Sequence, residues 1–211
     1  MKILIIGAAG KQGHQLLLEA LRRGHDVTGV VRNKSKLTDE GCKVIEKDLF
    51  NLTYDDLKDE DVIISAFGTW SPETGIQHKE STVFLANLLS RKGNRLMFVG
   101  GAGSLYTDST HTQRLMDSPD FPEAYYPTAS SMALAFEEIK KRNDVNWTYL
   151  SPSADFDEEG QRTGRYKLGD EVILINSKGN SYISYADYAI AMIDEAERGD
   201  HIKRRFTVVS E

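Results

Sequence analysis

Short apolar runs alternate with longer amphipathic segments along the chain. Strand patterns cover residues 2–6, 26–32, 44–48, 62–66, 96–99, 147–150 and 206–209, and the first of them has the composition of a strand buried on both faces. The amphipathic segments repeat their apolar positions at helical spacing, and they cover residues 12–23, 78–92, 129–143 and 184–199. Such alternation is typical of a parallel sheet covered by helices. We therefore predict an α/β fold, a Rossmann-type doubly wound parallel sheet with three α/β/α layers.

The C-terminal part of the chain departs from this regular alternation. Residues 165–168 and 172–175 flank Gly169-Asp170, which predicts a β-hairpin. Ser184 and Asp187 have the spacing of a capping box at a helix start. Two long stretches, about 101–125 and 153–184, follow strands at their carboxyl ends, where ligands bind in such sheets. We expect these insertions to form the substrate site.

The first predicted strand leads into a glycine-rich turn and then a helix. Gly7, Gly10 and Gly13 are spaced G-x-x-G-x-x-G, and a second strand completes a βαβ unit. Glycines let the backbone approach a pyrophosphate, and a helix N-terminus offers it unpaired N–H groups. A purely structural turn would have the same glycines, but the βαβ context favours a dinucleotide. The residues expected to bind it here are Gly7, Ala9, Gly10, Lys11, Gln12 and Gly13.

The end of the second predicted strand indicates which dinucleotide is bound. NAD-binding chains place an acid there for the ribose 2′-hydroxyl, whereas an arginine suits the 2′-phosphate of NADP. Here Arg32, Asn33 and Lys34 follow the strand, with no acid before Asp39. An exposed basic turn would explain these residues too. We expect NADP(H) to be preferred over NAD(H), with Arg32 and Asn33 at the 2′-phosphate.

Composition narrows the class of protein. The 211 residues carry a net charge of −6 without a basic block, so we expect no nucleic-acid partner. The apolar run at the start is too short for a signal sequence or a membrane span. The lone Cys42 predicts no internal disulfide, and the histidines lack metal-ligand spacing. We expect one Rossmann domain over residues 1–211, cytoplasmic, without a metal, and a monomer or weak homodimer.

Several motifs occur in the same order as in one known group of proteins. They are GAAGKQG at 7–13, VGGAGSL at 99–105, YYPTA at 125–129, WTYLSP at 147–152 and SYADYA at 184–189. They resemble the atypical short-chain dehydrogenase/reductases, and within them the NmrA-like NAD(P)-binding chains often called NADH-flavin reductases. The biliverdin/flavin reductases are similar more loosely.

This resemblance implies further cofactor-binding positions. Asp48 and Leu49 would lie beside the adenine, and residues 66–68 would follow the ribose and pyrophosphate. The positions that the resemblance adds are Asp48, Leu49, Ala66, Phe67, Gly68, Gly100, Gly101, Ser151 and Pro152. The last four would approach the nicotinamide. A strand-end turn would equally explain Asp48, and tight packing would explain Ala66 and Gly68.

One departure from the superfamily pattern decides the expected chemistry. Alcohol-oxidising members use Tyr-x-x-x-Lys, in which the ammonium lowers the tyrosine pKa. Here Ala129 follows Tyr125 at that spacing and Ser130 follows Tyr126, which argues against alcohol dehydrogenase, epimerase or dehydratase chemistry. A flavin, quinone or similar conjugated acceptor needs no such acid, because its ring delocalises the added charge and solvent can supply the proton.

We therefore predict an NADP(H)-dependent reductase of a small conjugated acceptor, with a flavin possible as substrate. The predicted catalytic residues are His78, Ser104 and Tyr126; an exposed helix start for His78 and a turn role for Ser104 are the alternatives. An aromatic wall for stacking the acceptor would comprise Trp70, Tyr106, Phe121, Tyr125, Tyr126 and Phe156. The main rival hypothesis is a non-catalytic NADP(H)-binding redox sensor of the NmrA-like type.

Overall fold

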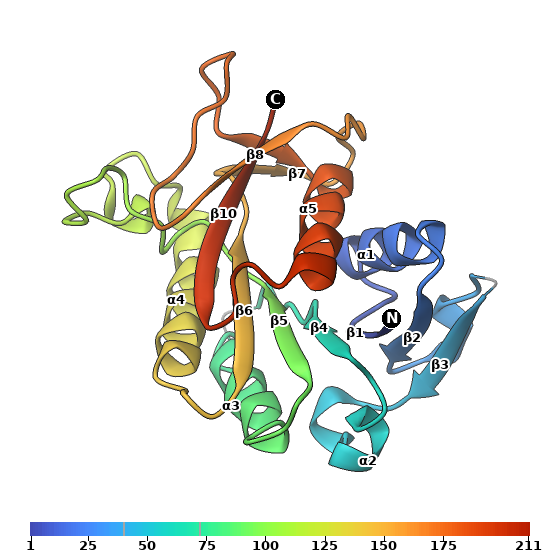
Figure 1. Cartoon of the computed structure of the whole chain (residues 1–211). Coiled ribbons are helices and arrows are strands. Elements are labelled where there is room, and N and C mark those ends of the chain that lie inside the picture. Colours follow the sequence, from blue (N-terminus) through green and yellow to red (C-terminus); the bar gives the residue numbers. More distant parts are fainter. Residues whose placement is uncertain (40, 72) are drawn as a thin grey trace.

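A central eight-stranded sheet organises the chain in a computed structural model that describes residues 1–39, 41–71 and 73–211 (Figure 1). Its strands are β1 (Lys2–Ile6), β2 (Asp26–Val31), β3 (Cys42–Glu46), β4 (Val62–Ser65), β5 (Arg95–Val99), β6 (Asn146–Ser151), β8 (Tyr166–Gly169) and β10 (Arg204–Ser210). Their order is β3-β2-β1-β4-β5-β6-β10-β8, and every neighbouring pair is parallel except β10–β8. The first six strands follow the order 3-2-1-4-5-6 of dinucleotide-binding sheets.

Two pairs of helices cover the two faces of this sheet, which confirms the predicted three-layer α/β/α fold (Figure 1). The longer helices are α1 (Lys11–Arg22), α3 (Gln77–Leu88), α4 (Tyr126–Lys140) and α5 (Tyr185–Arg198). α1 packs beside α5, and α3 packs beside α4. One apolar core lies under α1 and α5, and a second lies under α3 and α4. No helix in the described part of the chain is long and apolar enough to cross a membrane.

Short helical segments complete the element list. They are α2 (Tyr54–Leu57) and the single 3-10 turns η1 (Lys34–Lys36), η2 (Leu49–Asn51), η3 (Leu115–Asp117) and η4 (Glu123–Tyr125). Local signals fix several helix ends. The Ser184 hydroxyl accepts from the Asp187 N–H at 3.0 Å at the start of α5, as its sequence predicts. Gly199 ends α5 with φ +73°, a conformation that favours glycine.

The predicted hairpin is wrong. Its first arm forms β8, but β8 pairs antiparallel with β10. In the second arm, only Val172 forms a bridge, and its partner is Tyr106. Residues 172–175 instead lie beside β8 through side chains, because the Leu174 side chain fills the space where a Cβ on Gly169 would stand, 2.8 Å from Leu174 Cδ2. Side-chain packing has replaced main-chain pairing at this turn.

Other element boundaries also differ from the pattern. α4 begins at Tyr126 rather than near 129, helped by Pro127 in its first turn, and α3 ends at Leu88 rather than near 92. A small parallel pair that the pattern did not predict, β7 (Asp155–Asp157) with β9 (Tyr182–Ser184), lies within the second insertion. This pair ties the two ends of the insertion together.

Candidate functional site

The glycine-rich turn lies between β1 and α1 and is too crowded for larger residues. Gly7 has φ +79°, and a Cβ there would lie 2.9 Å from the Ala66 carbonyl oxygen. A Cβ on Gly13 would lie only 2.1 Å from the Gly7 carbonyl oxygen. The first turn of α1 therefore packs directly on the end of β1, which brings the helix N-terminus to the carboxyl edge of the sheet.

The N-terminus of α1 has the donors that an anion requires. Gly10 is its N-cap and offers no side chain, and the first turn contains no acid. Within the described residues, the N–H groups of Lys11, Gln12 and Gly13 have no backbone acceptor outside the helix. The buried Gln12 donates through Nε2 to the Tyr185 carbonyl at 3.3 Å, while its Oε1 has no partner in the described structure. Unpaired amide donors and an orphaned amide oxygen fit a pyrophosphate and its sugar.

The Lys11 side chain points to the second insertion. Its ammonium pairs with Glu158 at 2.5 Å, and this hydrogen bond raises the pKa of Lys11. Both side chains are exposed, so solvent screens the attraction between the two charges. A phosphate bound at the helix N-terminus would compete with Glu158 for the same cation.

The end of β2 combines basic residues with an acid that the sequence pattern missed. Arg32 is exposed and forms no ion pair among the described residues. Asn33 accepts from the Ser35 N–H at 2.9 Å and so caps the turn η1. Glu46 lies beside Val31 in the parallel register of β2 and β3, and its carboxylate accepts from the Lys34 N–H at 3.0 Å. Glu46 lies at the end of β2 because of the register between β2 and β3, which the sequence pattern does not reveal.

The positions added by the resemblance gather at the same sheet edge. Asp48 caps the turn η2 by accepting from the Phe50 N–H at 3.0 Å, and Leu49 is buried. The Ala66 N–H donates to the Ile6 carbonyl at 3.0 Å, which holds the end of β4 against β1. Gly68 is exposed, with open space where a Cβ would point. Their contacts with a cofactor remain predictions.

Gly100 and Ser151 lie at the carboxyl ends of β5 and β6. The Gly100 N–H donates to the Leu150 carbonyl at 2.8 Å, and a Cβ on Gly100 would lie 2.2 Å from Tyr149 Cε1. Gly101 follows at the start of the first insertion. Ser151 and Pro152 are buried, and the Ser151 hydroxyl has no partner among the described residues.

His78 is the second residue of α3 and is buried, so the alternative of an exposed helix start is wrong. Burial lowers the pKa of His78, so the imidazole is neutral at pH 7. Its Nε2 lies 3.0 Å from the Thr69 carbonyl oxygen, which can only accept, so Nε2 carries the proton. The ring also borders a cavity of about 20 Å³ with Ser65 and Tyr149, large enough for about one water molecule.

Ser104 is buried and bonded to a residue that the sequence analysis did not consider. Arg205, on β10, donates through Nη1 to the Ser104 hydroxyl at 2.8 Å and to its carbonyl at 3.2 Å. Tyr126, by contrast, is 45 % exposed at the start of α4. No sequence motif marked Arg205, because 101 residues separate it from Ser104.

The lysines of α4 lie at the end of the helix opposite to its tyrosines. Lys140 pairs with Glu137 at 3.6 Å and Lys141 with Glu138 at 3.2 Å. Neither can therefore serve Tyr126, which begins the helix fourteen residues before Lys140. The described structure thus gives Tyr126 no neighbouring lysine of the Tyr-x-x-x-Lys type.

The six aromatic residues of the predicted wall do not stack on one another in the described structure. Phe156 packs on Tyr185 and Tyr188 of α5, with ring centroids 4.2 and 4.8 Å apart. Tyr106 stacks on His111 at 4.6 Å. Whether these side chains stack an acceptor stays a prediction.

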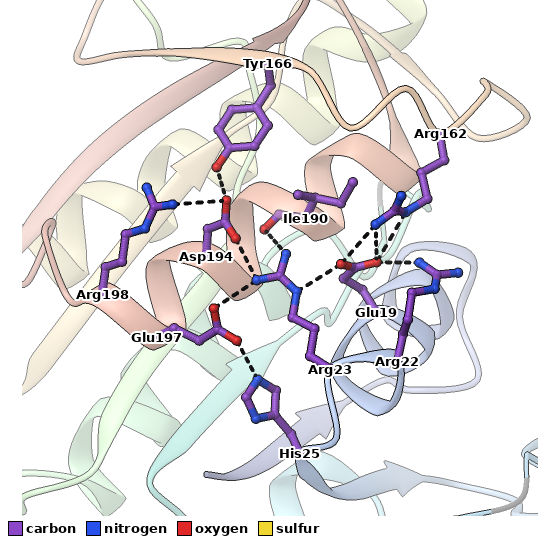
Figure 2. Close-up of polar contacts among 10 residues, drawn as sticks. All are labelled: Glu19, Arg22, Arg23, His25, Arg162, Tyr166, Ile190, Asp194, Glu197 and Arg198. Carbon is purple, nitrogen blue, oxygen red and sulfur yellow. Dashed lines mark hydrogen bonds and ion pairs between the residues drawn. The ribbon is translucent and has the colours of Figure 1, made fainter.

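An ion-pair network fastens the second insertion to α1 and α5. Figure 2 shows Arg23, the C-cap residue of α1, reaching Glu19, Asp194 and Glu197, while Arg162 of the insertion binds Glu19 at 3.1 Å. Burial alone would raise the pKa of Glu19, but hydrogen bonds from Arg23 and Arg162 outweigh it and hold the pKa below its usual value. With the Lys11–Glu158 pair, this network lays the insertion along α1, beside the glycine turn. The described residues contain no group of three or more side chains suited to a metal ion.

Comparisons with known proteins agree with this geometry. Residues 7–198 match a family model described as NAD(P)H-binding. YwnB, an uncharacterized protein of Bacillus subtilis (strain 168), is 47% identical over 100% of this chain and 99% of its own length.

Two solved structures are also similar. SP1627 of Streptococcus pneumoniae TIGR4, described as a putative NADH-flavin reductase, is 44% identical over 100% of both chains, with a TM-score of 0.96. A protein of Bacteroides thetaiotaomicron described as a putative epimerase is 38% identical over 99% of this chain and 96% of its own, with a TM-score of 0.87.

The family match covers the glycine turn, all four longer helices and the strands β2 to β6. The resemblance to NmrA-like NAD(P)-binding reductases is thereby confirmed. The chain belongs to the NAD(P)H-binding family.

Proposed function

We propose that this protein is an NADP(H)-dependent oxidoreductase that reduces a flavin, a quinone or a similar conjugated acceptor. One observation carries the proposal: the dinucleotide turn of an NAD(P)H-binding chain is combined with two tyrosines at the start of α4, Tyr125 and Tyr126, that have no lysine at the Tyr-x-x-x-Lys spacing. The first feature supports nicotinamide chemistry. The second favours an acceptor that needs no tyrosine acid.

The amides of Lys11, Gln12 and Gly13 would hold the pyrophosphate, helped by the positive end of the α1 dipole. The orphaned Gln12 Oε1 is suited to accept a hydrogen bond from a ribose hydroxyl or a carboxamide. Gly100, Gly101 and Pro152 would confine the nicotinamide end. When bound, NADPH supplies the hydride.

Arg32 and Glu46 have opposing effects on cofactor choice. The Arg32 guanidinium is exposed and suited to a bidentate contact with a 2′-phosphate. The Glu46 carboxylate is engaged by the Lys34 N–H, which lessens its repulsion of a phosphate. Lys34, Ser35 and Lys36 add donors on the same turn. The balance supports a preference for NADP(H).

The residues near the acceptor have limited capacity to move protons. The His78 Nε2 proton is held by the Thr69 carbonyl, and the neutral ring is a poor acid. The Ser104 hydroxyl oxygen already accepts from Arg205. Tyr126 is exposed to water. These side chains can therefore orient an acceptor, while solvent supplies the proton that accompanies its reduction.

Two similar proteins point to different chemistries, since one is described as a reductase and one as an epimerase. Sugar epimerisation of the short-chain type uses the tyrosine–lysine pair to remove a hydroxyl proton. Lys140 and Lys141 lie at the far end of α4 and are paired with glutamates. This arrangement favours the reductase.

A panel of acceptors tests the proposal. Purified protein is first titrated with NADPH and NADH, and the saturated protein is then supplied with free flavins, quinones, aldehydes and ketones while nicotinamide oxidation is recorded. We expect turnover with flavins or quinones and none with aldehydes or ketones. Tight NADPH binding without turnover of any acceptor would instead support the redox sensor.

A further inference from the structure

Arg205 is a buried cation that no part of the proposed reaction uses. It is the second residue of β10, and its side chain is 1 % exposed. Moving a guanidinium out of water is costly, and its one carboxylate partner, Glu171, is 34 % exposed. Arg205 Nε has no hydrogen-bond partner among the described residues. The cost of burying this guanidinium with one donor unpaired must therefore be offset by the bonds of its other donors.

The guanidinium connects three segments that are far apart in the sequence. Nη1 holds both oxygens of Ser104, at 2.8 and 3.2 Å. Nη2 forms the ion pair with Glu171. The planar group lies over the Phe136 ring of α4, with its Cζ 4.3 Å from the ring centroid, a favourable cation–π contact.

Backbone hydrogen bonds fasten the same loop on its other sides. The Leu105 carbonyl accepts from the Leu115 N–H at 2.7 Å, and the Gly103 carbonyl accepts from the Met116 N–H at 2.9 Å. The Tyr106 N–H donates to the Glu171 carbonyl at 2.9 Å. Arg205 adds a side-chain anchor from β10 to these backbone contacts of the loop 100–106.

This loop begins with Gly100 and Gly101, at the carboxyl end of β5. A Cβ on Gly100 would clash with Tyr149, and one on Gly101 would lie 3.0 Å from Met132 Sδ. The loop backbone therefore packs closely on these two side chains. In the proposed function, this backbone forms one wall of the nicotinamide end. A shift of the loop would therefore misplace the two reacting rings.

We propose that Arg205 is a positioning residue, which acts through Ser104 to fix the loop 100–106 at the nicotinamide end of the site, with Glu171 orienting the guanidinium. This inference rests on the proposed function. Stability alone does not explain the arrangement, because buried ion pairs can often be replaced by apolar side chains without loss. Orientation of the reacting groups, in contrast, is sensitive to displacements of about 1 Å, which can reduce rates about a hundredfold.

The chain offers a matched control on the same strand. Arg204 pairs with Asp170 at 3.3 Å, as Arg205 pairs with Glu171, but its side chain is 59 % exposed. The experiment compares wild type, Arg205→Met and Arg204→Met in NADPH affinity, thermal unfolding, and kcat and KM for the best flavin or quinone. We expect Arg205→Met to remain folded and bind NADPH within about twofold of wild type, with kcat lowered roughly tenfold or more. Arg204→Met should match wild type.

Wild-type kcat in Arg205→Met would overturn the proposal. So would a loss of activity that only parallels unfolding or loss of NADPH binding, since a structural role alone explains that result. If Arg205→Met does not fold, Arg205→Lys replaces it. The ammonium lacks the planar fork that serves Ser104 and Glu171 together, so we expect a smaller loss of kcat, and an unchanged kcat contradicts the inference.

Hydrogen exchange separates this inference from the proposed function. If wild type reduces no acceptor, the proposed function fails, but the loop can still be followed. Amide exchange over residues 100–106 should be faster in Arg205→Met than in wild type or Arg204→Met, with NADPH present. Equal exchange in all three proteins would refute the positioning role, whatever the activity.

Discussion

Replacing Gly13 by alanine tests the geometry of the dinucleotide turn. The added Cβ would lie 2.1 Å from the Gly7 carbonyl oxygen and 2.8 Å from its carbonyl carbon, where real contacts are almost never under 3.0 Å. Both neighbours are backbone atoms, so no side chain can rotate away. The N-terminus of α1 must therefore move back by about 1 Å, and such overpacking costs about 1–3 kcal/mol of stability.

The same displacement should weaken cofactor binding. The amides of Lys11, Gln12 and Gly13 move together with the helix, and a hydrogen bond to a charged group is worth about 1.5–3 kcal/mol. Loss of a single such bond lowers affinity roughly tenfold or more, since about 1.4 kcal/mol corresponds to a factor of ten. We expect Gly13→Ala to raise the Kd for NADPH by at least that factor and to lower Tm by a few degrees, roughly 2–4 °C per kcal/mol.

Fluorescence titration with NADPH and thermal unfolding measure the two effects separately. Gly93→Ala is the matched control, because Gly93 is exposed in the turn after α3 and has open space where a Cβ would point. It should change neither Kd nor Tm appreciably. A folded Gly13→Ala protein with wild-type affinity for NADPH would show that the first turn of α1 does not hold the pyrophosphate.

Three further predictions concern selectivity, chemistry and pH. Arg32→Ala should weaken NADPH binding by about 1–3 kcal/mol and leave NADH nearly unchanged, whereas Glu46→Gln should favour NADPH; equal effects on both cofactors, measured by titration, would exclude these roles. Tyr126→Phe should lower kcat less than about tenfold, and a thousandfold loss would instead support acid–base alcohol chemistry. His78→Ala should lower kcat more than Tyr126→Phe only if protonation or carbonyl polarisation limits turnover. The pKa of Glu19 is lower in the folded protein than in the unfolded chain, where it is about 4.3. Ionised Glu19 therefore stabilises the fold above the unfolded pKa, and this stabilisation is lost as the pH falls through the folded pKa. Denaturant titrations should therefore show Glu19→Gln less stable at pH 7 by about 1–3 kcal/mol and less sensitive to acid; an unchanged pH dependence would contradict this.

Local patterns were enough to predict the sheet and the glycine turn. Each buried strand is a short apolar run, and the turn depends on residues within one βαβ unit, Gly7 to Gly13. Helix starts with a side-chain cap, such as Ser184, were also predictable. These features depend on residues close together in the chain, so the sequence alone carries their information.

Long-range pairing was not predictable in the same way. Glu46 reaches the end of β2 only through the register of β3, and Arg205 reaches Ser104 only because β10 lies beside β6. The hairpin at Gly169 failed for a related reason, since β8 found a better partner in β10 than in residues 172–175. His78 looked like an exposed helix start, but it is buried, and its Nε2 bonds to the Thr69 carbonyl.

Direct hydride transfer is the central claim, and an anaerobic single turnover tests it. Protein saturated with NADPH is mixed with the best flavin or quinone, and NADPH loss and acceptor reduction are recorded together, once with NADPH and once with NADPH deuterated at the transferred position. The account predicts one acceptor reduced for each NADPH oxidised, and slower transfer from the deuterated cofactor. Bound NADPH that stays reduced in the presence of every acceptor would contradict it.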